Sequence, residues 1–146
     1  LNEEINNFDN IFNNLDYVEP EISYDNFCEY NKNNEIRRSN ILFFCNLFLI
    51  DLISLNNIIN FFNFFINKFN HYILNDNKKN EADEISESIY ILVINTYTKI
   101  YKINSEVYNN IFNKITELSK IKIKNYKSLT NKSIFKFMNI IDELEK

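Results

Sequence analysis

The chain of 146 residues contains no glycine and no tryptophan, and it has a single proline and a single histidine. Walker-type phosphate loops and dinucleotide-binding fingerprints need glycine where the backbone approaches a phosphate, and the GxSxG elbow of hydrolases needs it for a sharp turn. One histidine cannot supply both metal ligands of an HExxH zinc site. These absences exclude several common enzyme motifs, and we expect a protein with no enzymatic activity, no cofactor and no metal.

The histidine and the two cysteines have few chemical partners nearby in the sequence. His71 has only Asp76 close to it, so we expect a histidine at the surface. Two cysteines do not make a disulfide framework, and Cys45 lies among apolar residues. We therefore expect Cys28 and Cys45 to be free thiols in a reducing compartment, and the protein to be cytoplasmic.

Long hydrophobic runs are also missing. The best one, residues 41–53, is interrupted by Asn46 and Asp51. It is shorter than the roughly 20 residues that a helix needs to span a bilayer, so we expect no membrane segment. The chain begins with Leu1 instead of methionine, which indicates a trimmed piece of a longer protein.

Asparagine, isoleucine, lysine, phenylalanine and tyrosine supply 90 of the 146 residues. Their codons consist mainly of A and T, so the composition indicates an AT-rich genome, and the many asparagines need no functional explanation. Asparagine-rich segments can be disordered. Here the asparagines alternate with apolar residues at helical spacing, which favours a packed domain.

Apolar residues recur at the three- and four-residue spacing of amphipathic helices through most of the chain. We therefore predict an all-α protein of about seven helices, in which short connections join antiparallel neighbours, as in a stack of helical hairpins or an orthogonal bundle. We expect the helices near residues 5–15, 27–30, 36–55, 57–74, 80–102, 105–118 and 130–144.

The expected breaks and caps follow from residue type. Pro20 predicts a break at residues 16–21, and polar residues predict loops at 31–35 and 75–80. Residues 120–124 (KIKIK) are interpreted as a fraying helix end. The expected N-caps are Asn80, Asn104 or Ser105, and Thr130.

The most apolar helix, over 36–55, should be buried on most sides. The residues that we expect to be largely buried are Phe43, Phe44, Leu47, Phe62 and Phe65.

Charge is distributed unevenly. Residues 1–36 carry nine acidic side chains and one lysine, whereas residues 37–146 carry 15 basic and 11 acidic side chains. Within residues 114–136 there are seven lysines and one glutamate. The acidic and basic segments could therefore bind different partners, or each other.

The candidate partner-binding residues come from this charge pattern. Lys120, Lys124 and Lys127 would share one face of a helix and could contact an RNA backbone or an acidic protein surface, or simply form a solvated helix end. Arg37 and Arg38 could hold an acidic partner bidentately, or pair with the acidic first 36 residues.

Two segments resemble a known family. Residues 37–48 read RRSNILFFCNLF, and residues 133–144 read SIFKFMNIIDEL. The first resembles a helix of the middle domain of eukaryotic translation initiation factor 4G, in which an arginine pair leads to Asn-Ile-x-Phe. The second resembles the closing helix of that domain, and residues 83–100 correspond to an acidic-capped helix between them. The resemblance covers about residues 35–146, the C-terminal three-fifths of the family domain.

The resemblance implies a HEAT-like stack of helical hairpins over residues 35–146, with residues 1–34 as an acidic remnant of earlier hairpins. It implies a non-catalytic scaffold that binds a DEAD-box RNA helicase in translation initiation, that can also contact RNA, and that acts as a monomer within a larger complex. Related scaffolds in mRNA decay, splicing and cap binding are not distinguished. Two alternatives stay open: a viral Bcl-2-type bundle that inhibits apoptosis, with 41–53 as its enclosed helix, and a structural helical subunit of a larger assembly.

Overall fold

The structure, a computed structural model, describes Phe8, Asn10 and residues 15–146. Over these residues it contains six α-helices and no strand, so the predicted all-α class is confirmed. The helix expected over residues 5–15 lies mostly outside the described residues. The elements are α2 (Tyr24–Leu49), α3 (Leu55–Leu74), α4 (Lys79–Ile94), α5 (Tyr97–Ile103), α6 (Ser105–Ser119), the short 3₁₀ turn η2 (Ile123–Asn125) and α7 (Asn131–Leu144).

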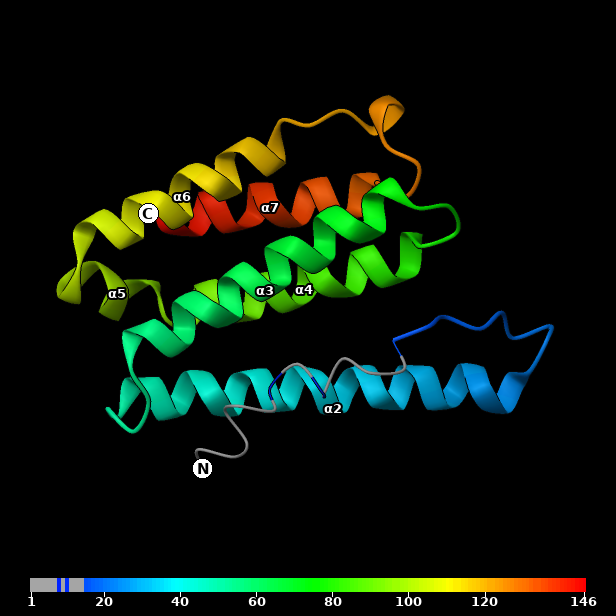
Figure 1. Cartoon of the computed structure of the whole chain (residues 1–146), viewed down its shortest axis with the longest axis horizontal. Coiled ribbons are helices and arrows are strands. Elements are labelled where there is room, and N and C mark those ends of the chain that lie inside the picture. Colours follow the sequence, from blue (N-terminus) through cyan, green and yellow to red (C-terminus); the bar gives the residue numbers. More distant parts are fainter. Residues whose placement is uncertain (1–7, 9, 11–14) are drawn as a thin grey trace.

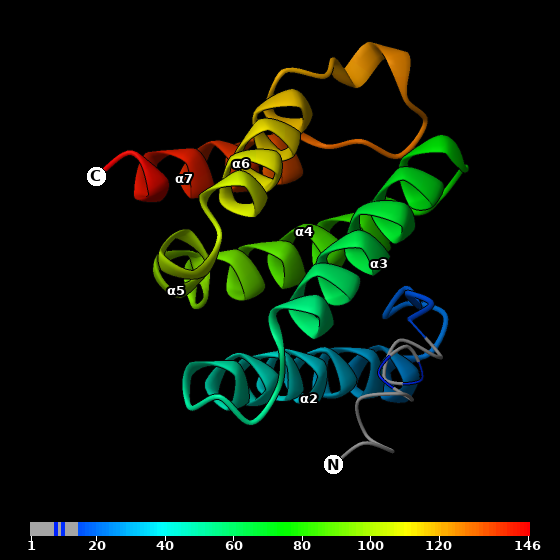
Figure 2. The same cartoon turned by 60° about the vertical axis from the view of Figure 1, so that its left-hand side comes forward.

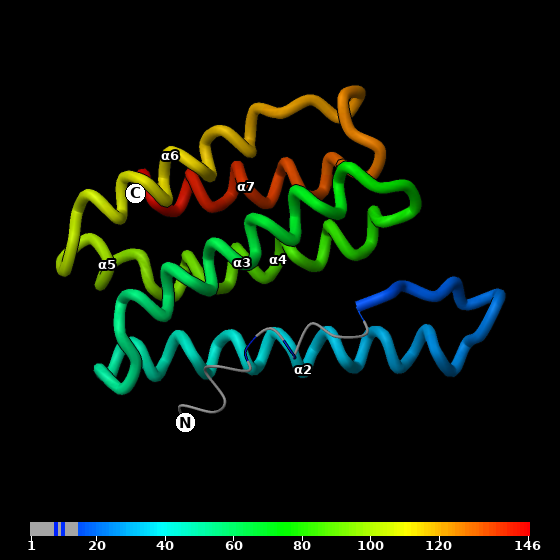
Figure 3. Tube along the Cα trace, viewed as in Figure 1, coloured from blue at the N-terminus to red at the C-terminus, as the bar shows by residue number. Residues whose placement is uncertain are grey.

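The long helices run antiparallel to their neighbours along the chain and lie in layers (Figure 1). Helix α2 forms one outer layer, α3 and α4 lie next to it, and α6 and α7 form the opposite layer, as a second view also shows (Figure 2). Helix α4 contacts α2, α3 and α7, so it occupies the centre of the molecule. The short helix α5 reverses the chain between α4 and α6 (Figure 3).

Side chains cap most helices where the sequence predicts a start. Asn104 accepts hydrogen bonds from the first turn of α6, and Thr130 accepts one from the Ser133 N–H in α7, so both predicted caps are confirmed. Ser54 and Asn57 form a reciprocal capping box at the start of α3.

The start of α4 differs from the prediction. Asn80 is not the cap, because the helix already begins at Lys79 and no side chain caps it locally. The backbone N–H of Lys78 instead donates to the Ser128 hydroxyl, at 3.0 Å, from a segment 50 residues away. A tertiary contact has taken the place of a local cap, and no local sequence pattern indicates it.

The helix predicted to run to Lys102 is broken at Asn95 and Thr96, which separate α4 from α5. The Asn95 amide donates to the Ile91 carbonyl at 2.8 Å, and the Thr96 hydroxyl donates to the Leu92 carbonyl at 2.6 Å. Polar side chains that bond to carbonyls one turn earlier compete with the helical ladder, which accounts for the break.

The loop predicted at residues 31–35 does not exist, because α2 runs without interruption through it. Ser23 caps this helix, and Tyr30 and Asn34 are buried against the rest of the protein. The stretch contains neither glycine nor proline, so tertiary packing decides its conformation. The predicted boundary between residues 34 and 35 therefore falls inside a single helix, whereas the break around Pro20 is confirmed.

The centre of the core is aromatic. The Phe8 ring stacks on Phe61 at a centroid distance of 3.9 Å and meets the edges of Phe44 and Phe65 at 5.5 Å. The predicted burial of Phe44, Leu47, Phe62 and Phe65 is confirmed.

Helix α2 is buried along one side only, so the prediction that 36–55 is covered on most sides is wrong. Phe43, predicted to be buried, is 49% exposed. The reason is position: α2 is an outer layer that packs on α3 and α4 and has no described helix on its far side. Residues 41–53 are thus not an enclosed central helix. From residue 36 onward, the large apolar side chains that the helix and the following turn expose are Ile36, Leu42, Phe43, Leu49, Ile50 and Leu52.

Lys99 of α5 fastens the C-terminal end of α2. Its ammonium donates to the Phe48 and Leu49 carbonyls, pairs with Asp51 and lies 4.7 Å from the centre of the Phe48 ring. Asp51 adopts a positive φ of 66°, and Asn77 in the next turn one of 58°. In a chain without glycine, aspartate and asparagine take these left-handed positions, which they tolerate better than most residues.

Both cysteines are free thiols, as predicted: Cys28 is exposed and Cys45 is buried. Burial raises the pKa of the Cys45 thiol to about 12. Among the described helices, none has the length and apolar character that crossing a membrane requires.

Candidate partner-binding surfaces

The lysines at residues 120–127 do not share a helical face as predicted. Helix α6 ends at Ser119, and the chain continues through an irregular loop that contains η2. The loop is held at its far end, where Ser128 and Leu129 are buried and the Ser128 N–H donates to the Ile73 carbonyl at 3.0 Å. This anchoring at the end of α3 pulls the chain away from the axis of α6.

Three lysines of the 114–136 segment are engaged by carboxylates. The ammonium groups of Lys114, Lys127 and Lys136 lie 3.5, 3.7 and 2.7 Å from carboxylate oxygens of Glu117, Asp76 and Glu87, respectively.

Lys120, Lys122 and Lys124 are exposed, and none of them has a carboxylate within ion-pair distance in the part of the chain that the structure describes. We call these three residues the basic loop. It projects from one end of the molecule between α6 and α7 (Figure 1). The basic loop differs from the predicted set of lysines, because Lys127 pairs with Asp76 and Lys122 is free of such a pair among the described residues.

The structure places Arg37 and Arg38 differently from either prediction. The Arg38 guanidinium binds the Glu84 carboxylate of α4 with two hydrogen bonds, of 2.7 and 2.6 Å. Arg37 is only 3% exposed, and its Nε and Nη2 atoms have no hydrogen-bond partner among the described residues. The Arg37 guanidinium is therefore not accessible to a partner, whereas the Arg38 side chain is 44% exposed but already engaged by Glu84. Among the described residues, neither arginine forms an ion pair with an acidic residue in 15–36.

Arg37 belongs to a buried polar cluster between α2 and α4, whose other members are Tyr30, Asn34, Glu81 and Glu84. Burial lowers the pKa of Arg37 and raises that of Tyr30 to about 12. Burial also raises the pKa of Glu84, although the Arg38 guanidinium opposes this shift.

A polar cavity of about 230 Å³ adjoins the buried cluster. It contains carboxylates, amides and a guanidinium, which can hydrogen-bond a small polar molecule. Over the described residues, no three metal-ligating side chains come together, here or elsewhere. The cavity residues are Tyr17, Phe27, Tyr30, Asn31, Asn34, Arg38, Asn80, Asp83, Glu84, Glu87 and Lys132.

The second exposed surface is apolar. Ile36 and Phe43 are seven residues apart, so they lie along one side of α2, and Ile50 follows at the same spacing in the cap position after the helix. These three residues are 49%, 49% and 64% exposed, respectively. We call these residues the outer face of α2. Large exposed apolar side chains that share one side of an element are candidates for contact with another protein. The sequence could not identify them, because the part of α2 after Asn40 is apolar nearly all round and its pattern does not indicate which side is covered.

The predicted surface position of His71 is confirmed, in the last turn of α3. Asp76, its only neighbour of catalytic interest in the sequence, is engaged by Lys127.

No family model, curated protein or solved structure matches the chain.

Proposed function

We propose that the chain is a non-catalytic, HEAT-like scaffold domain that binds a DEAD-box RNA helicase in cytoplasmic translation initiation. The observation that carries the proposal is the correspondence between the resembling segments and the helices. Residues 37–48 lie in α2, residues 83–100 span α4 and α5, and residues 133–144 lie in α7. The order is that of the family domain, and layers of antiparallel helices are the arrangement that such a scaffold requires.

The two exposed surfaces supply the means of binding. The outer face of α2 offers apolar area to a protein partner, and a few large apolar side chains usually dominate such an interface. The basic loop offers three lysines without ion-pair partners among the described residues, which suits the phosphates of an RNA held by the helicase. On this proposal the protein partner contacts α2, and RNA contacts the opposite layer.

Binding of a purified DEAD-box translation helicase tests the first surface. We expect Phe43→Ser to weaken binding about tenfold, because it removes the central apolar side chain of the outer face. Leu74→Ser, at the end of α3, is the matched control: Leu74 is 60% exposed and lies outside that face. Equal loss with both variants, or no binding by the unmodified chain, would reject the proposal.

RNA binding by the basic loop has a separate signature. Replacing Lys120, Lys122 and Lys124 together by glutamate should weaken binding of single-stranded RNA uniformly across sequences. It should also reduce the slope of log Kd against log salt by about 2, because each phosphate contact releases counterions. A slope that does not change would show that RNA does not contact this loop.

One observation favours the Bcl-2-type alternative in modified form. Helix α4, not residues 41–53, is the helix that others surround, and an apolar groove of about 350 Å³ lies between α3 and α6. Its apolar lining consists of Ile59, Phe62, Ile66, Val107 and Ile111. This alternative predicts that an amphipathic helical peptide binds the groove, and that Ile66→Ser abolishes its binding without affecting the helicase.

A further inference from the structure

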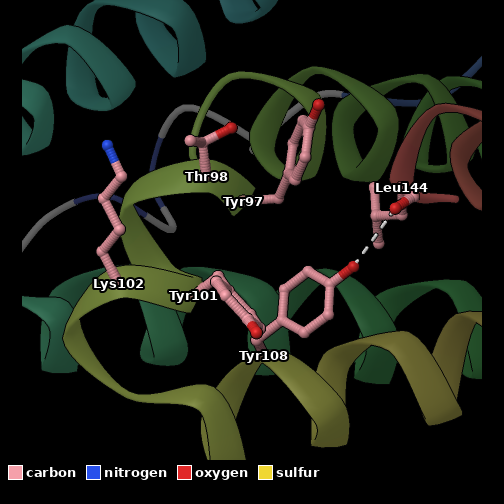
Figure 4. A pocket seen from close by; sticks show the side chains of 6 residues that line it. All are labelled: Tyr97, Thr98, Tyr101, Lys102, Tyr108 and Leu144. Carbon is pink, nitrogen blue, oxygen red and sulfur yellow. Dashed lines mark hydrogen bonds between the residues drawn. The ribbon is translucent and has the colours of Figure 1, made fainter. Parts of the chain in front are cut away.

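A pocket lined by tyrosines lies at the end of the molecule opposite the basic loop, where α5, α6 and the C-terminal end of α7 meet. Its volume of about 270 Å³ is near the lower end of the roughly 300–1,000 Å³ typical of small-molecule sites. The lining residues are Tyr97, Thr98, Tyr101, Lys102, Tyr108 and Leu144 (Figure 4).

The rings present their faces from different directions. The centroids of Tyr101 and Tyr108 are 5.2 Å apart and the two ring planes cross at 81°, so the pair forms a corner. The Tyr97 ring lies across the pocket from this corner (Figure 4). The Tyr108 hydroxyl donates to the Leu144 carbonyl at 3.4 Å, which fixes the orientation of its ring.

The electrostatic surroundings favour a positive ligand. Aromatic faces carry negative charge density, and the C-terminal end of α7 is the negative end of the helix dipole. Burial raises the pKa of Tyr108, and the nearby Tyr97, Tyr101 and Glu145 raise it further. Because Glu145 acts on Tyr108 through its charge, a carboxylate lies close to the pocket.

One lining residue opposes a cation. The Lys102 stem borders the pocket, but its ammonium points away from the three rings (Figure 4). The exposed lysines of the basic loop lie at the far end of the molecule (Figure 1).

We propose that this pocket binds an alkylated ammonium group, held against the three tyrosine faces by cation–π attraction. A methylated lysine side chain of a protein and a choline headgroup share this chemistry. The inference is independent of helicase binding, because the pocket shares no residue with the outer face of α2 or with the basic loop.

Titration with choline and with its neutral carbon isostere, 3,3-dimethylbutan-1-ol, tests the role of the charge. The chain contains nine tyrosines and no tryptophan, so aromatic-ring NMR shifts provide a direct readout. We expect saturable choline binding at millimolar concentrations and binding of the isostere about tenfold weaker. Equal binding of the two compounds would show an apolar pocket with no preference for cations.

Variants of the lining residues test whether choline binds in this pocket. Tyr101→Leu should weaken choline binding about tenfold, and Tyr101→Phe should retain it, because the ring and not the hydroxyl faces the ligand. Tyr101 is 58% exposed, so neither variant should impair folding. Tyr24→Leu is the matched control, since Tyr24 is 67% exposed on α2 and lies far from the pocket. Lys102→Gln should strengthen binding by removing the opposing charge.

A trimethyllysine peptide distinguishes the two sources. Tighter binding of this peptide than of choline, and no binding of its unmethylated form, would identify a protein partner; choline binding alone would identify a headgroup. Absence of binding by both compounds would overturn the proposal. So would binding of adenosine monophosphate that Lys102→Gln abolishes, because the pocket would then stack a base and hold a phosphate.

Discussion

Arg37 and Arg38 are consecutive residues whose guanidinium groups lie in opposite surroundings. Arg38 is 44% exposed at its side chain and binds Glu84, which is 4% exposed, through two short hydrogen bonds. Arg37 is buried, and two of its nitrogens have no partner among the described residues. Breaking a pair leaves a buried charge uncompensated, whereas removing a buried group with unsatisfied hydrogen-bond donors relieves a desolvation cost.

Substitution of each arginine by methionine, which keeps most of the unbranched apolar stem and removes the guanidinium, should therefore have opposite effects. We expect Arg37→Met to raise the free energy of unfolding by about 1 kcal/mol and Arg38→Met to lower it by about 2 kcal/mol. Urea denaturation at neutral pH measures both. Losses of similar size would mean that Arg37 has a stabilising partner.

The Arg38→Met defect should depend on pH. Burial raises the pKa of Glu84 above its ordinary value of 4.5, so its protonated form favours the folded state. That contribution is complete below pH 4.5 and is lost as the pH rises through the raised pKa. Without Arg38 the pKa of Glu84 should rise further, and the defect should shrink below pH 4.5. A defect that is constant with pH would indicate lost packing instead of an unpaired carboxylate.

Tyr30 provides the corresponding test in alkali. Burial raises the pKa of Tyr30 from 10.0 to about 12, so the neutral phenol favours the folded state. This contribution to the free energy of unfolding is complete below pH 10.0 and is lost as the pH rises through 12. Among the described residues the hydroxyl makes no hydrogen bond of good geometry, although the Asn34 side chain lies close enough to oppose part of the pKa rise. Tyr30→Phe should raise the unfolding free energy by about 1 kcal/mol at neutral pH, and this advantage should grow as the pH exceeds 10.0. A lower stability of the variant at neutral pH would show that the hydroxyl is bonded.

At the scale of the element, the side of α2 that is turned toward the core determines which of its many apolar residues stabilise the fold. Phe44 is 5% exposed and contacts the rings of Phe8 and Phe61, whereas its neighbour Phe43 is 49% exposed. The exposed side is the outer face that we assign to a partner.

The two phenylalanines form a matched pair. We expect Phe44→Ala to lower the unfolding free energy by about 3–5 kcal/mol, because it leaves a cavity in the aromatic core. Phe43→Ala should change it by less than about 1 kcal/mol. Thermal melting of the two variants gives the comparison, and equal losses would show that α2 is covered on both sides in solution.

The positions of most helices and two of their N-caps could be predicted from the sequence, because the spacing of apolar residues and the capping hydrogen bonds involve residues close together in the chain. Asn104 and Thr130 cap their helices as expected. The start of α4 and the continuity of α2 depend instead on contacts between distant segments, such as the Ser128 hydroxyl at the Lys78 N–H. The same limit applies to the candidate sites, because the partners of Arg38 and Lys127 lie on other elements.

At the scale of the whole molecule, the central helix α4 separates surfaces of different character. The apolar outer face lies on the α2 layer, the basic loop projects from one end of the α6–α7 layer, and the tyrosine pocket lies at its other end. A scaffold needs such separated surfaces to bind several partners at once. The tyrosine pocket could not be found in the sequence, because Tyr97, Tyr101 and Tyr108 meet Leu144 only after the last helix folds back.

The measurement that tests the scaffold proposal most directly is the RNA-dependent ATPase rate of a DEAD-box translation helicase, with and without this chain. A scaffold that holds the helicase in a productive arrangement should raise the rate several-fold and show saturation. Phe43→Ser should require about tenfold more protein for half-maximal stimulation, and Leu74→Ser should behave like the unmodified chain. A rate that stays at the level of the helicase alone, at chain concentrations far above those of the enzyme, would contradict the proposal.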